Sequence, residues 1–430
     1  MEIIRLSAPD YRQRLTPLLQ RSAFDPVIDD AVAGILAAVR ANGDAAVADY
    51  AEKFDGVRLS PRDFRVTSAD LAEAEATVDA PTREMIAAVR AQIAAFARQR
   101  LPEAWHFSPR PGVVLGEQFA PLDRVGCYVP GGTAPLISTV LHTVTLAATA
   151  GVKDIVVVTP PGPQGKVNPA ILHACRVAGA TEVYRLGGVY AVAALAYGTM
   201  TIPKVEKIVG PGNAYVTAAK RQLYGEVALD LVAGPSEIMI IADHTADPRF
   251  IAADMLSQAE HGSGREQAVL VSTAPELLEQ VRAELLRQSA ALSRAACVKT
   301  VLDKGVFLLE AADLDDAADL ASRYAPEHLE LMVAEPTRLA PRITAAGAIF
   351  LGPWTPEPVG DFVAGPSHVL PTGGAAKFFS GLTIEHFFRR MSLVSYDQDA
   401  LARELPMITC LAGHEGLDAH GNAAAIRRQK

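Results

Sequence analysis

The chain has 430 residues, of which 50% are hydrophobic and 21% are charged, a composition typical of a soluble globular protein with roughly two to four domains. Its net charge is −9 and its pI is near 5.6. This acidic balance argues against a nucleic-acid partner, because phosphate contacts need clustered Lys and Arg side chains, whereas a small cationic substrate would be compatible with it.

About the first hundred residues are Ala-rich and helical in pattern. The helical periodicity runs through VIDDAVAGILAAVRA, DAAVADYAEKFD and SADLAEAEATVDAPTREMIAAVRAQIAAFARQR. We expect residues 1–25 to form an N-terminal extension. The helices should open a unit that spans residues 26–235.

From about residue 112, short β-rich runs alternate with helical runs. The β-rich runs are DIVVVTP, TEVYRLG and KIVGPGN, and the helical runs are PAILHACRVAG, VYAVAALAYG and AYVTAAKRQLYG. This alternation is typical of βαβ units around a parallel sheet. The unit over residues 26–235 should therefore contain a Rossmann-like, doubly wound domain.

A second α/β series begins with SEIMIIAD at residue 236. Its further predicted elements are a helix over 248–261, QAVLVST, a helix over 275–293, VFLLEA, LDDAADLASRYA, HLELMVA, a helix near 336–345 and GAIFLG. This series predicts a second doubly wound domain over residues 236–380. Residues 381–430 have the pattern of helices too short to bury a core, so we expect them to pack against something else.

One predicted helix carries two polar side chains at its end. Asp247 suits its N-cap, Pro248 its first position and Gly262 its C-terminal stop. Residues three apart share one helical face, so Gln258 and His261 should project together from the last turn. They could begin a metal or substrate site. For the pair alone, a solvated helix end where His favours the helix dipole is the preferred interpretation.

Further polar residues gather where the elements of the second series end. They are Glu327 and His328 in RYAPEHLEL, Asp361 and His368 in PVGDFVAGPSHVLPTGG, and His414, Glu415, Asp418 and His420 in the tail. Each has an ordinary explanation as a packed or solvated side chain. Together they would lie at the rim of an α/β sheet, where ligands usually bind. Imidazole, amide and carboxylate donors without Cys suit zinc or a similar divalent ion.

The Gly-rich turns give only a weak nucleotide signal. No GxGxxG follows a predicted strand, and the nearest turns are VPGGTAP at 129–135, LGGVYA at 186–191 and VGPGNAY at 209–215. The last two link a strand to a helix, where free backbone N–H groups could meet a pyrophosphate. For each turn alone, a tight turn that needs Gly is the favoured interpretation.

The four cysteines, at positions 127, 175, 297 and 410, show no CxxC spacing. They therefore predict neither a disulfide framework nor a thiolate zinc site, and a reducing cytoplasm is the expected compartment. The start, MEIIRLSAPDYRQRL, lacks the apolar region of a secretory signal, and we find no uninterrupted apolar run of about 18 residues that would span a membrane.

Seven sequence blocks, in this order, resemble the zinc-dependent, NAD-linked histidinol dehydrogenase family. They are DRVGCYVPGGTAP, EKIVGPGNAYVTAAKR, DLVAGPSEIMIIAD, AADMLSQAEHG, RYAPEHLEL, AGAIFLGPWTPEPVGDFVAGPSHVLPTGG and EGLDAH, and the similarity runs from about residue 20 to the C-terminus. The resemblance implies oxidation of L-histidinol through L-histidinal to L-histidine, with one NAD reduced in each step. These are the last steps of histidine biosynthesis.

The resemblance also implies roles for individual residues. The implied zinc ligands are Gln258, His261, Asp361 and His420, and the implied NAD contacts are Tyr128, Asn213 and Tyr190. Substrate contacts are implied for Ser236, Glu415 and His420, together with His328 and the other zinc ligands. His328 would take the hydroxyl proton, since its ordinary pKa suits proton transfer near neutral pH. Glu327 would activate the water that attacks the aldehyde.

The family fold implies an intertwined homodimer of two Rossmann-like domains. Its C-terminal segment, here residues 381–430, would cross to the partner, so that Glu415 and His420 complete the other subunit's site. One departure stands at Tyr190, where many relatives have Gln. Another is LISTVLHTVTLAATAGV after GGTAP. A thiohemiacetal on Cys127 is disfavoured, because this residue lies within a strand-like run.

These departures keep other activities open. The first alternative is a paralogue that oxidises another small alcohol, such as a sulfonated propanediol. Glu415 and His420 favour an amino-imidazole substrate, since a carboxylate should repel a sulfonate. A metallohydrolase that uses Glu327 and a zinc-bound water is less favoured, and a non-catalytic metal or nucleotide binder is the third alternative.

Overall fold

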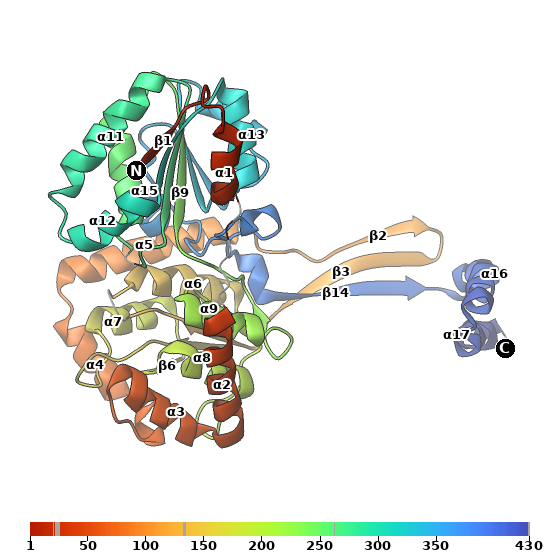
Figure 1. The fold of residues 1–430 in the computed structure, drawn as a ribbon. Helices are drawn as coiled ribbons and strands as arrows, with labels where there is room; N and C mark the ends of the chain where they lie inside the picture. The colour runs from red at the N-terminus through yellow and green to blue at the C-terminus, as the bar shows by residue number, and fades with distance from the viewer. Residues whose placement is uncertain (20, 22–25, 132–134, 262, 429–430) are drawn as a thin grey trace.

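The computed structural model describes residues 1–19, 21, 26–131, 135–261 and 263–428. They form two lobes, drawn one above the other in Figure 1, and a long arm that extends sideways from the region between them. Each lobe is built on a parallel β-sheet covered by helices. The chain therefore has the mixed α/β class that its alternating sequence predicts.

The lower lobe contains a five-stranded parallel sheet with the order β6-β5-β4-β7-β8. In chain order its strands are β4 (Arg124–Tyr128), β5 (Asp154–Val158), β6 (Glu182–Tyr184), β7 (Lys207–Val209) and β8 (Ala228–Leu229). The helices between them are α6 (Ile137–Ala150), α7 (Pro169–Ala178), α8 (Gly188–Tyr197) and α9 (Ala214–Gln222). All six predicted runs between residues 154 and 225 thus have the secondary structure expected of them.

Helices cover both faces of this sheet, because successive side chains of a strand point to opposite faces. On one face Val125, Cys127 and Val157 pack with α6, α7 and α5 (Ala80–Arg98). On the other face Val156 and Val158 pack with α8, α9 and α2 (Pro26–Asn42). The predicted N-terminal helices therefore complete both layers, together with α3 (Asp44–Tyr50) and α4 (Ser68–Thr77).

The upper lobe contains a six-stranded parallel sheet with the order β1-β11-β10-β9-β12-β13. Its strands are β1 (Glu2–Ile4), β9 (Glu237–Ala242), β10 (Gln267–Ser272), β11 (Val306–Glu310), β12 (His328–Met332) and β13 (Ala348–Leu351). One face packs against α10 (Pro248–Ala259), α11 (Pro275–Ser289) and α12 (Ala295–Lys304), and the other against α1 (Tyr11–Leu19) and α13 (Leu314–Tyr324). The sequence analysis did not predict α12.

The N-terminal residues join the upper lobe rather than the neighbouring lower one. Strand β1 pairs in parallel with β11, with Ile3 opposite Leu308. Ile4 is fully buried, and Leu15 and Leu18 of α1 lie in the same core cluster. The sequence pattern gave no sign of this pairing, because the partner strand lies about three hundred residues further along the chain.

The helix predicted over residues 248–261 is shorter than expected. Asp247 is its N-cap and accepts the backbone N–H of Arg249, as predicted, but α10 ends at Ala259. Gln258 therefore lies in the last turn, whereas His261 lies just beyond the helix, its N–H donating to the Gln258 carbonyl at 3.3 Å. The predicted stop, Gly262, lies outside the described residues.

The arm is a three-stranded antiparallel sheet that ends in two helices (Figure 1). Its strands are β2 (Trp105–Arg110), β3 (Val113–Pro121) and β14 (Phe388–Tyr396), and the tip consists of α16 (Gln398–Glu415) and α17 (Asp418–Ala425). The expectation that the tail is only helical is wrong for β14, which pairs with β3 along nine residues. This long-range pairing cannot be recognised from the tail alone.

The arm exposes apolar side chains along its length. They include Trp105, Phe107, Leu393 and Val394 on the strands and Met407, Leu411 and Leu417 at the tip. Just before β14, the chain passes over the lower lobe, and Val369, Ile384 and Phe387 are buried in the core of that lobe. None of the described helices is both long and apolar enough to cross a membrane.

Candidate active site

The adjacent pair Glu327 and His328 is buried where β12 begins, beside the start of β9. One residue of β9 contacts both side chains through its backbone. The N–H of Glu237 donates to Glu327 Oε2 at 2.9 Å, and the carbonyl of Glu237 lies 3.1 Å from His328 Nδ1. In the neutral form of His328, a proton on Nδ1 would satisfy that carbonyl and leave the lone pair on Nε2.

The helix α15 (Glu357–Phe362) brings two carboxylates to the other side of the His328 ring. His328 Nε2 lies 3.4 Å from Asp361 Oδ1 and 3.9 Å from Glu357 Oε1. One ligand atom from each of these three residues lies within 4.8 Å of the others. The sequence analysis missed Glu357, although it stands four residues before Asp361 and hence on the same helical face.

Gln258 is fully buried, and neither atom of its amide has a hydrogen-bond partner among the described residues. Buried amides are nearly always paired, so this exception needs an explanation. Its neighbour Ser257 donates a hydrogen bond of 2.9 Å to Glu357 Oε2, which brings the end of α10 to α15. The Nδ1 atom of His261 lies 3.2 Å from Ser236 Oγ, which precedes β9.

These residues meet at the amino-terminal ends of the strands in the upper sheet. Helix α10 runs back across this sheet, so its last turn reaches the edge at which β9 and β12 begin. Ligands of doubly wound sheets usually bind at the carboxyl ends. Glu327, His328 and Gln258 therefore lie at a rim of the sheet, as expected, but the rim is the opposite one.

Burial governs the electrostatics of this site. It raises the pKa of Glu327 to about 8, although the charge of His328 opposes the shift. Burial likewise raises the pKa of Glu357 to about 8, and nearby Asp361 adds to the shift. Burial alone would lower the pKa of His328, but the neighbouring carboxylates outweigh it and raise that pKa to about 10.

Asp361 and His261 shift in the opposite direction. Burial opposes ionisation of Asp361, yet the His328 ring, whose Nε2 lies 3.4 Å from Asp361 Oδ1, holds the pKa of Asp361 below the ordinary value. Desolvation lowers the pKa of His261, which favours the neutral imidazole that metal ligation needs. A carboxylate, a neutral imidazole and an unpartnered amide are donors that zinc accepts.

A cleft of about 720 Å³ opens at the carboxyl ends of β4 and β7 in the lower sheet. Tyr128, Tyr190 and Asn213, the three implied NAD contacts, all line it, as does Asp55. The Tyr190 hydroxyl donates to Asp55 and accepts the Gly187 N–H at 3.1 Å. The Tyr128 hydroxyl accepts the Gly188 N–H at 3.2 Å. The two glycine amides therefore already have partners.

A family model described as histidinol dehydrogenase matches residues 19–428. The chain belongs to this family. It is 45% identical over 413 residues to histidinol dehydrogenase of Heliobacterium mobile, with 96% of each chain covered. Identity to the Desulfotalea psychrophila enzyme is 46% over 418 residues, again with 96% of each covered. The crystal structure of histidinol dehydrogenase from Elizabethkingia anophelis superposes with a TM-score of 0.93 at 34% identity, covering 100% of this chain and 98% of that one.

Two family positions lie far from the rest of the site. Glu415 ends α16 and His420 lies on α17, and both are exposed at the tip of the arm. Figure 1 shows these helices well away from β9 and from the body of the two lobes. A single chain therefore brings together Ser236, Gln258, His261, Glu327, His328 and Asp361, but it does not add Glu415 and His420.

Burial accounts for Cys127, and contacts with α6 position His368. Cys127 is fully buried on β4, and burial raises the pKa of its thiol to about 12, so it is a poor nucleophile at neutral pH. The His368 ring stacks on His142 of α6 with centroids 4.6 Å apart, and its Nε2 lies 3.3 Å from Thr139 Oγ1. This contact joins α6 of the lower lobe to the loop after α15.

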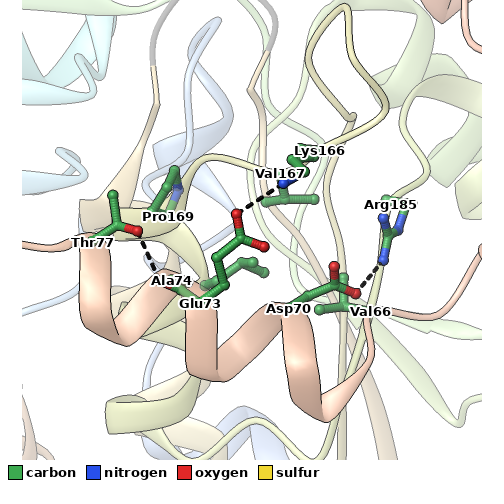
Figure 2. A pocket seen from close by; sticks show the side chains of 10 residues that line it. Val66, Asp70, Glu73, Ala74, Thr77, Lys166, Val167, Pro169 and Arg185 are labelled. Carbon is green, nitrogen blue, oxygen red and sulfur yellow. Dashed lines mark hydrogen bonds and ion pairs between the residues drawn. The ribbon is translucent and has the colours of Figure 1, made fainter.

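The hollow in Figure 2 lies between α4 and residues 166–169 and has a volume of about 120 Å³. Two ion pairs cross it: Asp70 with Arg185 at 2.6 Å and Glu73 with Lys166 at 2.9 Å. These four charged side chains pair with one another and attach α4 to the lower lobe. We therefore interpret the hollow as part of this attachment and not as a ligand site.

The unpartnered amide of Gln258 leads to a stability prediction. In metal-free protein, Gln258→Met should raise the free energy of unfolding by about 1 kcal/mol, because an apolar group of similar shape removes an unsatisfied buried amide. Chemical denaturation after treatment with a chelator measures the change. Gln267→Met is the matched control and should destabilise, since Gln267 accepts the Tyr324 hydroxyl at 2.8 Å. Equal destabilisation by both variants would contradict the prediction.

Proposed function

We propose that this chain oxidises L-histidinol through L-histidinal to L-histidine and reduces one NAD in each step, as the last steps of histidine biosynthesis. Membership of the histidinol dehydrogenase family supports the reaction. The observation that carries it is the buried Glu327–His328 pair, held by the backbone of one β9 residue beside a carboxylate, an imidazole and an unpartnered amide.

The donor set fits one zinc ion per subunit. Gln258, His261 and Asp361 would hold it from one chain, and His420 from a second copy. The orphaned amide of Gln258 supports this assignment, because ligation through its oxygen would explain an otherwise costly burial. When bound, zinc supplies a Lewis acid that anchors and orients the substrate. Ser236, which contacts His261, and Glu415 would add substrate contacts.

His328 is the proposed general base. The carboxylates around His328 hold a proton on its ring, so the base form would require a cation at Asp361 to offset them. In that form the Nδ1 proton would face the Glu237 carbonyl and Nε2 would accept the hydroxyl proton of the alcohol, and bound NAD would supply the hydride acceptor. In its ionised form, which the Glu237 N–H stabilises, Glu327 would take a proton from the water that adds to the aldehyde carbon. The resulting hydrate would give up a hydroxyl proton and a second hydride, for which a second bound NAD would be the acceptor, and so yield the carboxylate product.

The cleft in the lower lobe is the proposed NAD site. Numbered along the chain from β4 and from β9, each parallel sheet has the order 3-2-1-4-5, with β1 added at the edge of the upper sheet. This order supports two Rossmann-like domains and a switch point between β4 and β7, where the cleft opens. Tyr128 and Asn213 would contact the dinucleotide. Tyr190 would contribute its ring, since its hydroxyl is bonded to Asp55 and Gly187.

The arm supports an intertwined homodimer. Its exposed apolar side chains would be covered by a second copy, and residues 381–430 would deliver Glu415 and His420 to that copy's site. Since the described chain carries all four cysteines as free thiols, we also propose a reducing, cytoplasmic location.

The departure at Tyr190 keeps a paralogue that oxidises another small alcohol as the second candidate. We expect purified protein to produce about two NADH per L-histidinol, because the full oxidation removes four electrons. Absorbance of the reduced cofactor measures this yield. A sulfonated propanediol is the comparison substrate. Turnover of that diol without turnover of L-histidinol would favour the paralogue.

Removing the Tyr190 hydroxyl should affect stability more than cofactor binding. Tyr190→Phe leaves the Asp55 carboxylate and the buried Gly187 N–H without their partner, so the free energy of unfolding should fall by about 1 to 2 kcal/mol. The Kd for NADH, from fluorescence titration, should change less than about threefold. Tyr215→Phe, at an exposed position of the same cleft, should change neither. A much larger loss of NADH affinity would make the Tyr190 hydroxyl a direct ligand.

Shared sites predict complementation between two inactive variants. A His328→Asn chain keeps an intact tip, and a His420→Asn chain keeps an intact body. A mixed dimer therefore holds one complete site, and we expect about half the activity of the unaltered dimer. The two chains are refolded together, separated by affinity tags and assayed. Inactive mixed dimers of verified composition would show that each chain builds its own site.

A further inference from the structure

One side chain of the N-terminal segment, Arg21, contacts Glu237, the residue that holds the catalytic pair. Arg21 Nε lies 2.9 Å from Glu237 Oε1, and Arg21 Nη2 donates to Glu237 Oε2 at 3.2 Å. The two side chains are only 9% and 5% exposed, so water screens this ion pair weakly. Arg21 precedes its partner, Glu237, by more than two hundred residues in the chain.

Arg21 is itself held in one orientation. Its guanidinium carbon lies 3.5 Å from the centroid of the Tyr324 ring, and Nη2 also donates to the Tyr324 carbonyl at 2.9 Å. The Tyr324 hydroxyl donates to Gln267 at the start of β10, so the ring is fixed from its far end. A planar guanidinium can stack on the ring and bond a carboxylate at once, which an ammonium cannot do.

Glu237 is the common support of the two catalytic groups. Its N–H binds Glu327, its carbonyl faces His328, and its carboxylate also accepts the Gly373 N–H at 3.0 Å. Glu237 is also the first residue of β9 and has a register partner on the β10 side, Gln267, whereas the pairing with β12 begins one residue later, at Ile238. Any rotation of this residue would displace Glu327 and His328 together.

We propose that Arg21 is a positioning residue of the reaction: by clamping the Glu237 side chain, it fixes the two peptide groups that orient Glu327 and His328. The inference rests on the catalytic roles proposed above for this pair. A displacement of about 1 Å from productive geometry can lower a rate by about a hundredfold. Loss of the clamp on Glu237 should therefore lower the reaction rate.

The competing explanation is that Arg21 only docks the N-terminal segment. Arg5 provides the control, because it also ties that segment to the upper lobe. Its Nη2 lies 2.9 Å from Glu279 Oε1, but the pair is 36% and 44% exposed and contacts neither Glu237 nor the catalytic pair. If docking alone mattered, Arg5→Ala and Arg21→Met should reduce turnover alike.

The test uses the full-length, zinc-loaded protein. We expect Arg21→Met to lower kcat for L-histidinol by about tenfold or more, while Arg5→Ala changes it by less than about twofold. In Arg21→Met, zinc content and the Kd for NADH, both measured without turnover, should stay within about twofold of the unaltered protein. Arg21→Lys should have an intermediate kcat, because it retains the charge but loses the stacking and part of the fork.

A second variant separates positioning from loss of fold. Arg21→Met leaves the Glu237 carboxylate buried without its cation, so adding Glu237→Gln should recover kcat by about threefold or more. If Arg21→Met alone fails to fold, the double variant and Arg21→Lys decide the matter. Unchanged kcat in Arg21→Met, or no recovery and no intermediate value in these two variants, would overturn the inference.

The His328→Asn variant distinguishes the catalytic role proposed for the Glu327–His328 pair from the positioning role proposed for Arg21. Full activity in that variant would remove the proposed role of the pair and this inference with it. An inactive His328→Asn variant together with a fully active Arg21→Met variant would overturn the positioning role alone.

Discussion

The parallel pairing of β9 with β12 is the constraint on which the site depends. It sets His328 opposite Ile238 and so brings the peptide groups of Glu237 between the Glu327 carboxylate and the His328 ring. The same register brings the start of both strands to one edge, where the end of α10 also arrives. Backbone groups at the start of a strand hold Glu327 and His328 more firmly than a loop would.

Several carboxyl groups are buried around the site, and their burial costs free energy. Asp254, Glu237, Glu327, Glu330 and Glu357 are all buried close to β9, β12 and α15. Burial raises the pKa of Glu237 to about 7, with Arg21 opposing the shift, and that of Asp254 to about 6. Such a cluster is stable only where cations or shared protons compensate it. Arg21 and His328 supply part of that compensation, and a divalent ion at Asp361 would supply more.

The two lobes use opposite edges of their sheets. In the lower lobe the cleft opens at the carboxyl ends of β4 and β7, the usual position for a dinucleotide. In the upper lobe Glu327 and His328, the proposed acid–base pair, lie where β12 begins, beside the start of β9. The contacts of His368 with Thr139 and His142 link these regions, since they join α6, which follows β4, to the loop that follows Asp361. Helix α6 carries the departure from the family noted in the sequence.

The sequence by itself determined the α/β class, the six alternating elements after residue 154, the Asp247 cap and the candidate residues, because these follow from local periodicity and from blocks preserved in order. It missed Glu357, which the four-residue spacing to Asp361 could have revealed. Only the tertiary structure decided that β1 joins the upper sheet, that β14 pairs with β3, and that Arg21 lies under Glu237. These contacts join residues hundreds of positions apart, and they arise from strand edges and buried charges that need partners, which no local pattern encodes.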